Sequence, residues 1–486
     1  MMKSFSFILS VLLLASIIML PVSANSAQES FVGTAANGAI IADGDSPIVV
    51  ERELLTFDIT DFPKTYYETV NEFLEYSSHV TAEYTFYNPA DYSVKANLLF
   101  PLGHIPTYVP SYTYDEATGE KIYFDYSEGY GVKTNGNTVQ ATLRHSYGDR
   151  YSAFDYEQQL EILSDSDVSF GAVKRSSRVY KYTFISDNFP ENENDLTFTI
   201  TLPESEDSHI LADPKYSFLD NSKNTLGFTV KEGEKFELYV IGKRIYELED
   251  TSAWKAYRRG VIKDKNLVKA EFKLSEKEEQ SFAELAMTEY DKSSGISEQD
   301  WYNGFVSYLK DLRVSKLYTN FARWRFDITD KLMCWYEYQI ELAPGERITN
   351  EVSAPMYPDV DLSYTPDIYS YTYLASPAKS FTEFAELQVV INTPYSVVSS
   401  MTDIRYGGAD VDIEKNDTGY RFLLKGLPDS EIRFTLSESE SPICEKQGGI
   451  PIEIKIFIME CIGVAVVIGT VILIVVHKRR KARKLN

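Results

Sequence analysis

Carboxylates are the most numerous groups in this sequence that could carry chemistry. Four short runs gather them, at residues 43–45, 164–167, 359–361 and 410–412. None has the alternating ligand spacing of an EF-hand loop. These runs could bind Ca²⁺ weakly, although carboxylates solvated in loops are the commoner explanation. The sequence indicates no other cofactor and no other metal.

Two carboxylates held roughly 5–10 Å apart are sufficient for a glycosidase, so a membrane-tethered hydrolase acting on an extracellular glycan is one hypothesis. The sequence contains no nucleophile elbow, no zinc-binding HExxH motif and no phosphate-binding glycine loop. An enzyme predicts a cleft with two carboxylates of different acidity, whereas a binding protein predicts an exposed aromatic surface. We favour the binding protein and keep the hydrolase as the alternative.

Tyrosine is unusually frequent, with 35 residues beside 27 Phe and 4 Trp. Exposed tyrosine rings stack on sugars or contact proteins, and they lose little side-chain entropy on binding. Tyrosine is also common in strands and on half-hydrated surfaces for purely structural reasons. One segment is especially rich in tyrosine and is therefore the candidate binding surface: Tyr108, Tyr112, Tyr114, Tyr123, Tyr126 and Tyr130.

A basic stretch near Trp254 and Tyr257 contrasts with the acidity of the chain. Such a patch could dock on an anionic wall polymer or a lipid headgroup, but surface cations more often pair with the protein's own acids. Its candidate residues are Lys255, Arg258, Arg259, Lys263 and Lys265.

Composition and charge exclude several classes of protein. With 48 Lys and Arg against 72 Asp and Glu, the net charge of −24 argues against a nucleic-acid partner. The 44% apolar content fits a globular protein of 486 residues with two or three domains. Three cysteines exclude a disulfide-rich scaffold. Cys334 and Cys444 are the one pair that could form a disulfide outside the membrane, unless Cys334 is a small buried hydrophobe.

The two ends of the chain predict its topology. Residues 1–24 have the pattern of a secretory signal peptide, with Lys3, an apolar run at 5–20, and small residues before a cleavage site after Ala24. Residues 456–476 form a second apolar run that spans about 31 Å as a helix, the thickness of a bilayer core. The chain is therefore predicted to be a single-pass type I protein of the plasma membrane with an extracellular ectodomain.

The membrane segment is followed by a basic cytoplasmic tail at 477–486, which fixes the orientation. Its cations are Lys478, Arg479, Arg480, Lys481, Arg483 and Lys484. Glu460 lies inside the apolar run about one turn from its outer end. It would contact a membrane-protein partner, or lie at the level of the outer headgroups.

Alternating apolar and polar residues predict half-buried antiparallel strands through most of the ectodomain. Asn135-Gly136 and Pro344-Gly345 are turn signals between such strands. The clearest alternating segments are 55–59, 80–86, 196–202, 236–240, 387–391, 420–424 and 432–436.

Helices are predicted in fewer places. Ser275 with Glu278 forms a capping box before an apolar stripe, and Ser297 with Asp300 opens a second helix whose apolar face runs from Trp301 to Leu312. Together they predict a helical hairpin. Shorter helices are predicted at 66–76 and 156–163.

These elements predict a mainly β ectodomain of tandem antiparallel β-sandwich domains with an inserted helical hairpin, plus one C-terminal transmembrane helix. The expected domains are a β-sandwich with a Tyr-rich insertion at 30–250, a basic linker and helical hairpin at 251–316, a second β-sandwich at 317–440 and a stalk at 441–455.

Short motifs carry a resemblance to known families. Residues 84–89 read YTFYNP and residues 98–102 read LLFPL, so one strand ends in Asn-Pro and the next in Phe-Pro-Leu. This pattern resembles secreted bacterial proteins assigned to domains of unknown function and, loosely, the N-terminal strands of vault/inter-alpha-trypsin (VIT) domains. The Asp-x-Ser-x-Ser motif of the von Willebrand A domain that usually follows a VIT domain is missing from this sequence.

Residues 373–379 and 387–394 are similar to uncharacterised membrane-anchored surface proteins of clostridia. The resemblance implies a β-sandwich ectodomain on a Gram-positive cell and supplies no catalytic residue. We therefore expect a cell-surface interaction or envelope-accessory protein, with an extracellular protein, a wall polymer or a membrane-protein partner as its ligand.

Overall fold

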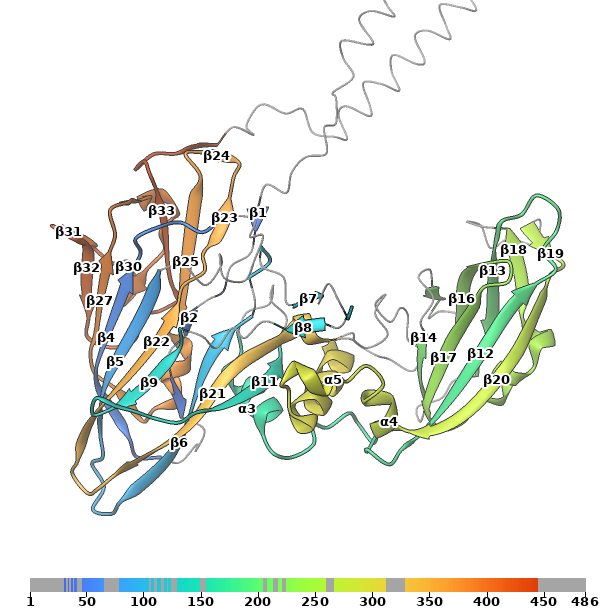
Figure 1. The fold of residues 1–486 in the computed structure, drawn as a ribbon, viewed down its shortest axis with the longest axis horizontal. Helices are drawn as coiled ribbons and strands as arrows, with labels where there is room; N and C mark the ends of the chain where they lie inside the picture. Colours follow the sequence, from blue (N-terminus) through green and yellow to red (C-terminus); the bar gives the residue numbers. More distant parts are fainter. Residues whose placement is uncertain are drawn as a thin grey trace, which may run out of the picture. The chain divides into compact units, whose positions relative to one another are not determined.

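The computed structural model of the chain (Figure 1) places most residues between 30 and 444. The expected signal peptide, membrane segment, Glu460 and basic tail lie outside the described residues. Within the described part of the chain, no helix is both long and apolar enough to cross a membrane. The described residues are 30–31, 34, 36–37, 39–41, 46–64, 78–104, 106–108, 112–114, 118–119, 121–123, 129–148, 154–203, 208–212, 217–220, 224–258, 266–311 and 328–444.

The fold is mostly β, as predicted, and its largest sheet has nine strands. Two of its central strands have ten and nine residues, and buried side chains alternate with more exposed ones throughout the shorter strand and, in the longer one, after an irregularity between Val50 and Arg52. All neighbours in the sheet are antiparallel except β4 (Val49–Asp58) with β27 (Leu387–Asn392) and β4 with β26 (Glu383–Phe384), which are parallel. The order is β10 (Asn137–Thr138), β9 (Gly131–Thr134), β22 (Arg347–Pro355), β5 (His79–Tyr87), β4 (Val49–Asp58), β27 (Leu387–Asn392), β32 (Gly419–Leu424) and β31 (Glu414–Asn416).

Two further sheets share a hydrophobic core with this large sheet, and we call the assembly the first sandwich. The first of them has the order β1 (Ser30–Phe31), β23 (Asp359–Asp361), β25 (Ile368–Leu374), β33 (Ile432–Ser437) and β28 (Ser396–Val397), with β2 (Ala36–Asn37) beside β25. The other has the order β11 (Thr142–Tyr147), β21 (Leu332–Leu342), β6 (Val94–Gly103) and β3 (Ile40–Ile41).

The apolar residues of the predicted alternating segments are buried in this core. Phe57 is fully buried and meets Phe434 edge-on, with ring centroids 5.0 Å apart. Burial of one such side chain contributes about 1.5–3 kcal/mol, so the repeated alternation provides most of the favourable free energy that holds the sheets together. The prediction of half-buried strands is confirmed for 55–59, 80–86, 387–391 and 420–424, whereas at 432–436 Thr435 is buried as well as Ile432, Phe434 and Leu436.

A second sandwich, formed within residues 178–281, has its own core of aromatic rings. Phe184, Trp254 and Phe272 pack at its centre, with the Trp254 and Phe272 ring centroids 4.4 Å apart. One sheet has the order β14 (Ser208–Ala212), β17 (Lys235–Gly242), β12 (Arg178–Asp187) and β20 (Glu271–Ser281). The other has the order β15 (Ser217–Asp220), β16 (Thr225–Lys231), β13 (Asp195–Thr201), β18 (Lys255–Arg258) and β19 (Leu267–Val268).

The described residues contain the α-helices α3 (Tyr156–Leu163), α4 (Phe282–Ala286) and α5 (Glu298–Asp311), and the first begins and ends as predicted. The helix predicted at 66–76 lies outside the described residues. Their hydrophobic core includes Leu211, Tyr239 and Ile241 from the second sandwich, because these residues alternate with the ones that face its aromatic core. Short 3₁₀ helices are η1 (Tyr246–Glu249), η2 (Thr251–Ala253), η4 (Lys292–Ser294), η5 (Thr329–Lys331), η6 (Ser376–Ser380) and η7 (Ser399–Met401).

A small unit separates from the rest by its contacts, and its described residues are Ser30, 361–368 and 437–444. In it β24 (Tyr364–Thr365) pairs antiparallel with β34 (Ile443–Cys444). The Ser437 hydroxyl donates to the Asp367 carbonyl at 2.8 Å. Neither Cys334, which belongs to the larger unit, nor Cys444 forms a disulfide bond in the structure.

The order of the domains along the chain differs from the prediction of a β domain at 30–250 followed by another at 317–440. β11 ends at Tyr147 and pairs with β21, which begins at Leu332, so the helices and the second sandwich form one insertion between two neighbouring strands. Within this insertion, the chain enters and leaves the second sandwich side by side, because Arg178 pairs with Ser281 and the Phe282 N–H donates to the Ser177 carbonyl at 2.8 Å. The expected tandem order is wrong because alternation predicts which side chains are buried but not which strands are neighbours.

The helical hairpin is present, but its first helix begins later than predicted. Residues 271–281 form β20, and the capping box is Ser281 with Glu284 rather than Ser275 with Glu278. The Ser275 hydroxyl instead donates to the Thr183 carbonyl at 2.9 Å. Pairing with β12 over ten residues therefore overrides the local capping signal.

Candidate functional site

The tyrosine-rich segment is an insertion between β6 and β9 that is anchored at both ends. At its start, Tyr108 is buried and its hydroxyl donates to the Pro358 carbonyl at 3.1 Å. At its end, the Tyr130 hydroxyl donates to the Leu102 carbonyl at 3.3 Å, and its ring meets Tyr336 edge-on. Burial raises the pKa of Tyr130 well above its ordinary value, so it remains a neutral donor. These two tyrosines are fixed to the first sandwich and do not form an exposed aromatic surface.

Between these anchors the segment forms a separate two-stranded hairpin (Figure 1). β7 (Tyr112–Tyr114) pairs antiparallel with β8 (Lys121–Tyr123), and Tyr112 and Tyr123 are register partners. Tyr126 lies outside the described residues. Four of the six candidate tyrosines therefore lie between two fixed ends, three of them in this hairpin.

The predicted basic patch lies partly on β18. Lys255 is exposed, while Arg258 forms an ion pair with Glu193 at 2.6 Å. The nearby rings of Trp254 and Tyr257 are buried in the second sandwich and are not part of a surface. Arg259, Lys263 and Lys265 lie outside the described residues. For Arg258 the structure supports the alternative that the cations of this stretch pair with the protein's own acids.

The acidic runs are used in ion pairs where they are described. Asp167 lies 2.8 Å from Arg175, Asp359 lies 3.7 Å from Arg433, and Asp410 lies 3.4 Å from Arg405. Among the described residues, no group of three or more His, Cys, Asp or Glu side chains is arranged to hold a metal ion. The run at 43–45 lies outside the described residues.

Arg144 is the centre of a buried ionic network that joins β11 to α5 and β21. Its guanidinium lies 3.1 Å from the Asp300 carboxylate and 2.6 Å from that of Glu337, and it donates to the Leu163 carbonyl at 2.6 Å. Burial alone lowers the pKa of Arg144, but the hydrogen bonds and charges of Asp300 and Glu337 more than offset this effect. Arg144 therefore stays charged, and the two acids are held by one shared cation.

α5 covers the free edge of the sheet that begins with β11. Asp300 is fully buried and accepts the backbone N–H of His145 at 2.8 Å. One turn later, Asn303 donates to the Ile162 carbonyl at 2.9 Å and accepts the Val168 N–H at 3.0 Å. The helix thus satisfies a strand edge that would otherwise be open to pairing with another chain.

His145 is a buried imidazole beside this network, and its Nδ1 atom makes no hydrogen bond. Burial lowers its pKa to about 4, opposed by the charge of Asp300 and reinforced by that of Arg144. The ring is therefore neutral at physiological pH.

A second buried acid, Glu53, lies in the core of the first sandwich. It accepts a hydrogen bond from the Tyr373 hydroxyl, whose oxygen lies 3.1 Å from that of Tyr84. Burial raises the pKa of Glu53 to about 7, against the lowering effect of the hydrogen bonds from Tyr373 and Tyr84.

Sequence analysis missed both buried polar groups, although each left a signal. Glu53 lies two, four and six residues before Leu55, Phe57 and Ile59, so alternation places its charged side chain on the apolar face of the strand. Asp300 and Asn303 lie on what appeared to be the solvent face of an amphipathic helix, and nothing local in the sequence indicates that Arg144 and the end of α3 cover that face.

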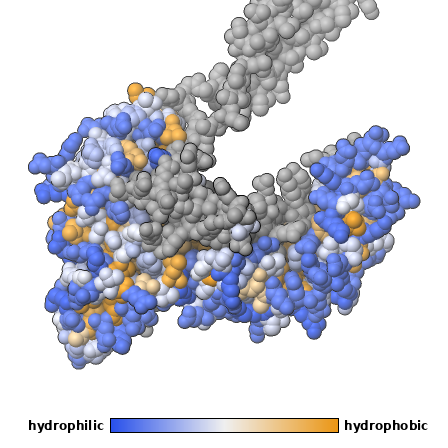
Figure 2. Space-filling view, viewed as in Figure 1, coloured by the Kyte–Doolittle hydropathy of each residue, from blue (hydrophilic) through white to orange (hydrophobic). Residues whose placement is uncertain are grey.

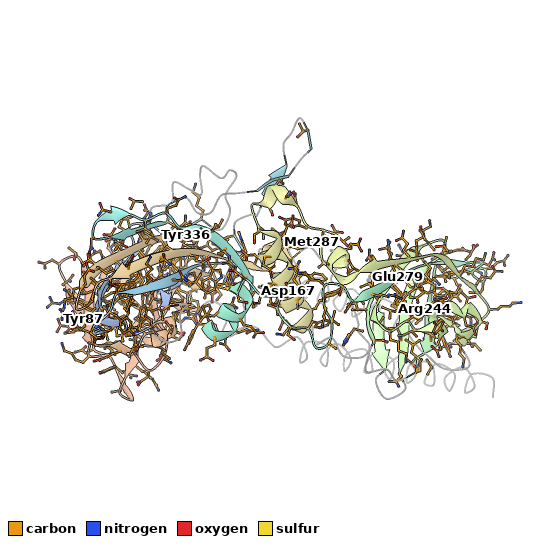
Figure 3. The ribbon with its side chains drawn as sticks, turned by 90° about the horizontal axis from the view of Figure 1, so that it is seen from below. Tyr87, Asp167, Arg244, Glu279, Met287 and Tyr336 are labelled. Atoms are coloured by element: carbon orange, nitrogen blue, oxygen red, sulfur yellow. The ribbon has the colours of Figure 1, made fainter. Side chains whose placement is uncertain are left out.

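On the face drawn in Figure 2, the described surface is largely hydrophilic. Its exposed large hydrophobic residues belong to different elements: Tyr92, Leu143, Tyr246, Leu267, Leu423 and Ile443. Figure 3 locates labelled side chains on the parts described above, with Tyr87 and Tyr336 on the first sandwich, Asp167 and Met287 near the helices, and Arg244 and Glu279 on the second sandwich.

Comparison with known proteins gives no family assignment. No protein-family model matches the chain, and no curated protein matches it in sequence. A solved structure from Legionella pneumophila, provisionally described as a nutrient-binding protein, is similar at 10% identity and a TM-score of 0.32, over 84% of this chain and 73% of that one. A likeness this distant carries no argument about function.

Proposed function

We propose that the chain is a single-pass type I protein of the plasma membrane whose acidic, β-rich ectodomain acts by binding. The observation that carries the proposal is the tyrosine-rich insertion, whose two terminal tyrosines are fixed to the first sandwich while three others lie in a hairpin between them. Anchoring both ends limits the conformations of the segment, which lowers the entropy lost when it binds. The ligand we propose is an extracellular protein or a wall polymer.

The location outside the cytosol is argued from the sequence. The apolar run at 456–476 is long enough for a bilayer, and the six cations that follow it favour a cytoplasmic C-terminus. Protease treatment of intact cells tests this topology. We expect the ectodomain to be degraded and a tag at the C-terminus to be protected, and a protected ectodomain would overturn the orientation.

The binding surface is tested with the purified full-length protein in detergent on an array of neutral and anionic glycans and wall polymers. The test variant replaces Tyr112, Tyr114, Tyr123 and Tyr126 by Ser. The matched control replaces Tyr92 and Tyr246 by Ser, because these rings are exposed, at 57% and 66%, and lie outside the insertion.

We expect a glycan or polymer to bind the wild type and the control variant, and to bind the test variant at least tenfold more weakly. Equal loss in both variants would show that the insertion is not the binding surface. If no polymer binds, the same three proteins are used to capture partners from solubilised membranes, and capture that does not depend on the four tyrosines would also overturn the assignment.

A further inference from the structure

Glu53 is a carboxyl group enclosed by the first sandwich. Its side chain is 2% exposed. On β4 it stands opposite Tyr84 of β5 and, on the other side, opposite Leu387 of β27. An ionised carboxylate in such a place requires a cation or several hydrogen-bond donors to replace its hydration.

The donors that reach Glu53 form a chain across the core. The Ala39 backbone N–H donates to the Tyr84 hydroxyl oxygen at 3.2 Å, and the two tyrosine oxygens lie 3.1 Å apart. Since Tyr373 donates its proton to Glu53 and Tyr84 already accepts from Ala39, Tyr84 is the donor in the bond between the tyrosines. The chain joins β4 and β5 of the nine-stranded sheet to β25 of the sheet that faces them.

The charged and titratable groups around Glu53 give it no compensating cation. The groups that act on its pKa are the hydroxyls of Tyr373 and Tyr84, and Tyr84 in turn faces Tyr338 of β21. Burial raises the pKa of both Tyr84 and Tyr373 well above the ordinary value, so they remain neutral. Among the described residues, no Lys, Arg or His is identified as acting on this cluster.

We propose that Glu53, Tyr373 and Tyr84 form a proton-dependent tie between the two facing sheets of the first sandwich. An ionised Glu53 accepts a stronger hydrogen bond from Tyr373 but has lost its hydration with no cation to replace it, so the tie stabilises the fold more when the Glu53 carboxyl is protonated. Because burial raises the pKa of Glu53 to about 7 from an unfolded value of 4.5, the folded state holds a proton that the unfolded state releases. The tie is therefore strongest below about pH 4.5, weakens as the pH rises to about 7, and changes little above that.

The proton itself is observed by infrared spectroscopy of the full-length protein. The difference spectrum between wild type and Glu53→Gln isolates the band of the protonated Glu53 carboxyl. We expect this band at pH 5 and expect it to disappear with a midpoint near pH 7. A midpoint near the ordinary value for a glutamic acid would overturn the proposal.

The weakening of the tie is observed by hydrogen exchange of amides in β4 and β25. Exchange in wild type is divided by exchange in Glu53→Gln at each pH, so that the intrinsic pH dependence cancels. We expect this ratio to rise on the order of 100-fold between pH 5 and pH 8, as follows from a shift of two to three pKa units. The matched control is Glu83→Gln, because Glu83 is an exposed residue of β5 whose register partner is Leu54, the neighbour of Glu53.

Tyr373→Phe separates the tie from a general loss of stability. It removes the hydroxyl that donates to Glu53 but keeps the ring, and the remaining carboxylate is less well stabilised. We expect the infrared midpoint to move to higher pH in this variant. A ratio that stays constant with pH in wild type, or a midpoint that Tyr373→Phe leaves in place, would show that Glu53 is an ordinary buried residue without this role.

Discussion

Arg144 is the residue on which the contact between β11 and α5 most depends. Its guanidinium neutralises Asp300, which is fully buried, and Glu337, which is about one-third exposed. Removing one partner of a buried ion pair leaves an uncompensated charge and costs about 3–5 kcal/mol. We expect Arg144→Met to lower the unfolding free energy of the first sandwich by about this amount in urea titrations.

The control for this prediction is an ion pair of similar chemistry on the surface. Arg421 pairs with Glu414 at 3.0 Å, and both side chains are about 60% exposed. Because exposed pairs contribute about 0–1 kcal/mol, Arg421→Met should change stability little. Similar losses in the two variants would mean that the Arg144 network is not energetically special.

His145 makes the first sandwich less stable in acid. Its pKa is lowered to about 4 in the folded protein against 6.5 for a free side chain, so the unfolded state binds the proton more tightly. Stability is fully present above about pH 6.5 and is lost as the pH falls to about 4, by up to about 3 kcal/mol. Glu53 has the opposite sign over nearly the same range, so the two effects largely cancel in the wild type.

The contribution of His145 is therefore measured in the Glu53→Gln background. We expect thermal unfolding of Glu53→Gln to shift to lower temperature between pH 7 and pH 5, and the further change His145→Leu to remove most of that shift. A shift of unchanged size in the double variant would contradict the assignment of the acid sensitivity to this imidazole.

At the scale of elements, strands were predicted correctly where buried and exposed side chains alternate. The prediction was wrong where pairing with a distant strand determines the secondary structure. The strand at 80–86 was predicted from Val80, Ala82, Tyr84 and Phe86, all of which are buried. The start of α4 was not, because the Ser275 box is a genuine local capping signal that loses to a ladder with β12. A capping signal indicates only a local preference for helix, and hydrogen bonding along a long neighbouring strand outweighs that preference.

Two glycines in hairpin turns test how closely strands of the large sheet approach. Gly419 has φ +148°, and a Cβ atom there would lie 2.0 Å from the Ile391 carbonyl oxygen. Gly345 has φ +70° with open space around it. We expect Gly345→Ala to cost about 1 kcal/mol through backbone strain alone, and Gly419→Ala to cost several times more because β27 and β32 must separate. Equal chemical-denaturation midpoints for the two variants would contradict this difference.

At the scale of the whole molecule, the pairing of distant strands was beyond prediction. β4 lies between β5 and β27, whose first residue is Leu387, and nothing in residues 49–58 identifies that partner. The anchoring of the tyrosine-rich insertion was equally hidden, since nothing near Tyr108 and Tyr130 in the sequence indicates that their hydroxyls donate to the Pro358 and Leu102 carbonyls. Composition and spacing located the segment but could not separate its fixed residues from the rest.

The insertion topology predicts how fragments of the chain behave. A fragment of residues 174–286 contains every strand of the second sandwich and its aromatic core, so we expect it to fold alone with a cooperative thermal transition. A fragment of residues 30–250 lacks β22 and β27, which flank β5 and β4. We expect its first-sandwich residues to show no protection in hydrogen exchange, whereas protection there would support the tandem order.

The same topology determines the order in which the two sandwiches can fold during synthesis. The second sandwich is contiguous, so it can fold soon after the ribosome passes residue 281, whereas β4 has no complete sheet until β27 and β32 exist more than 300 residues later. If the chain is exported as proposed, its first strands emerge early and wait longest for their partners. During that interval their edges remain unpaired, and a delay in translation after residue 331 should increase aggregation more than a delay before residue 178.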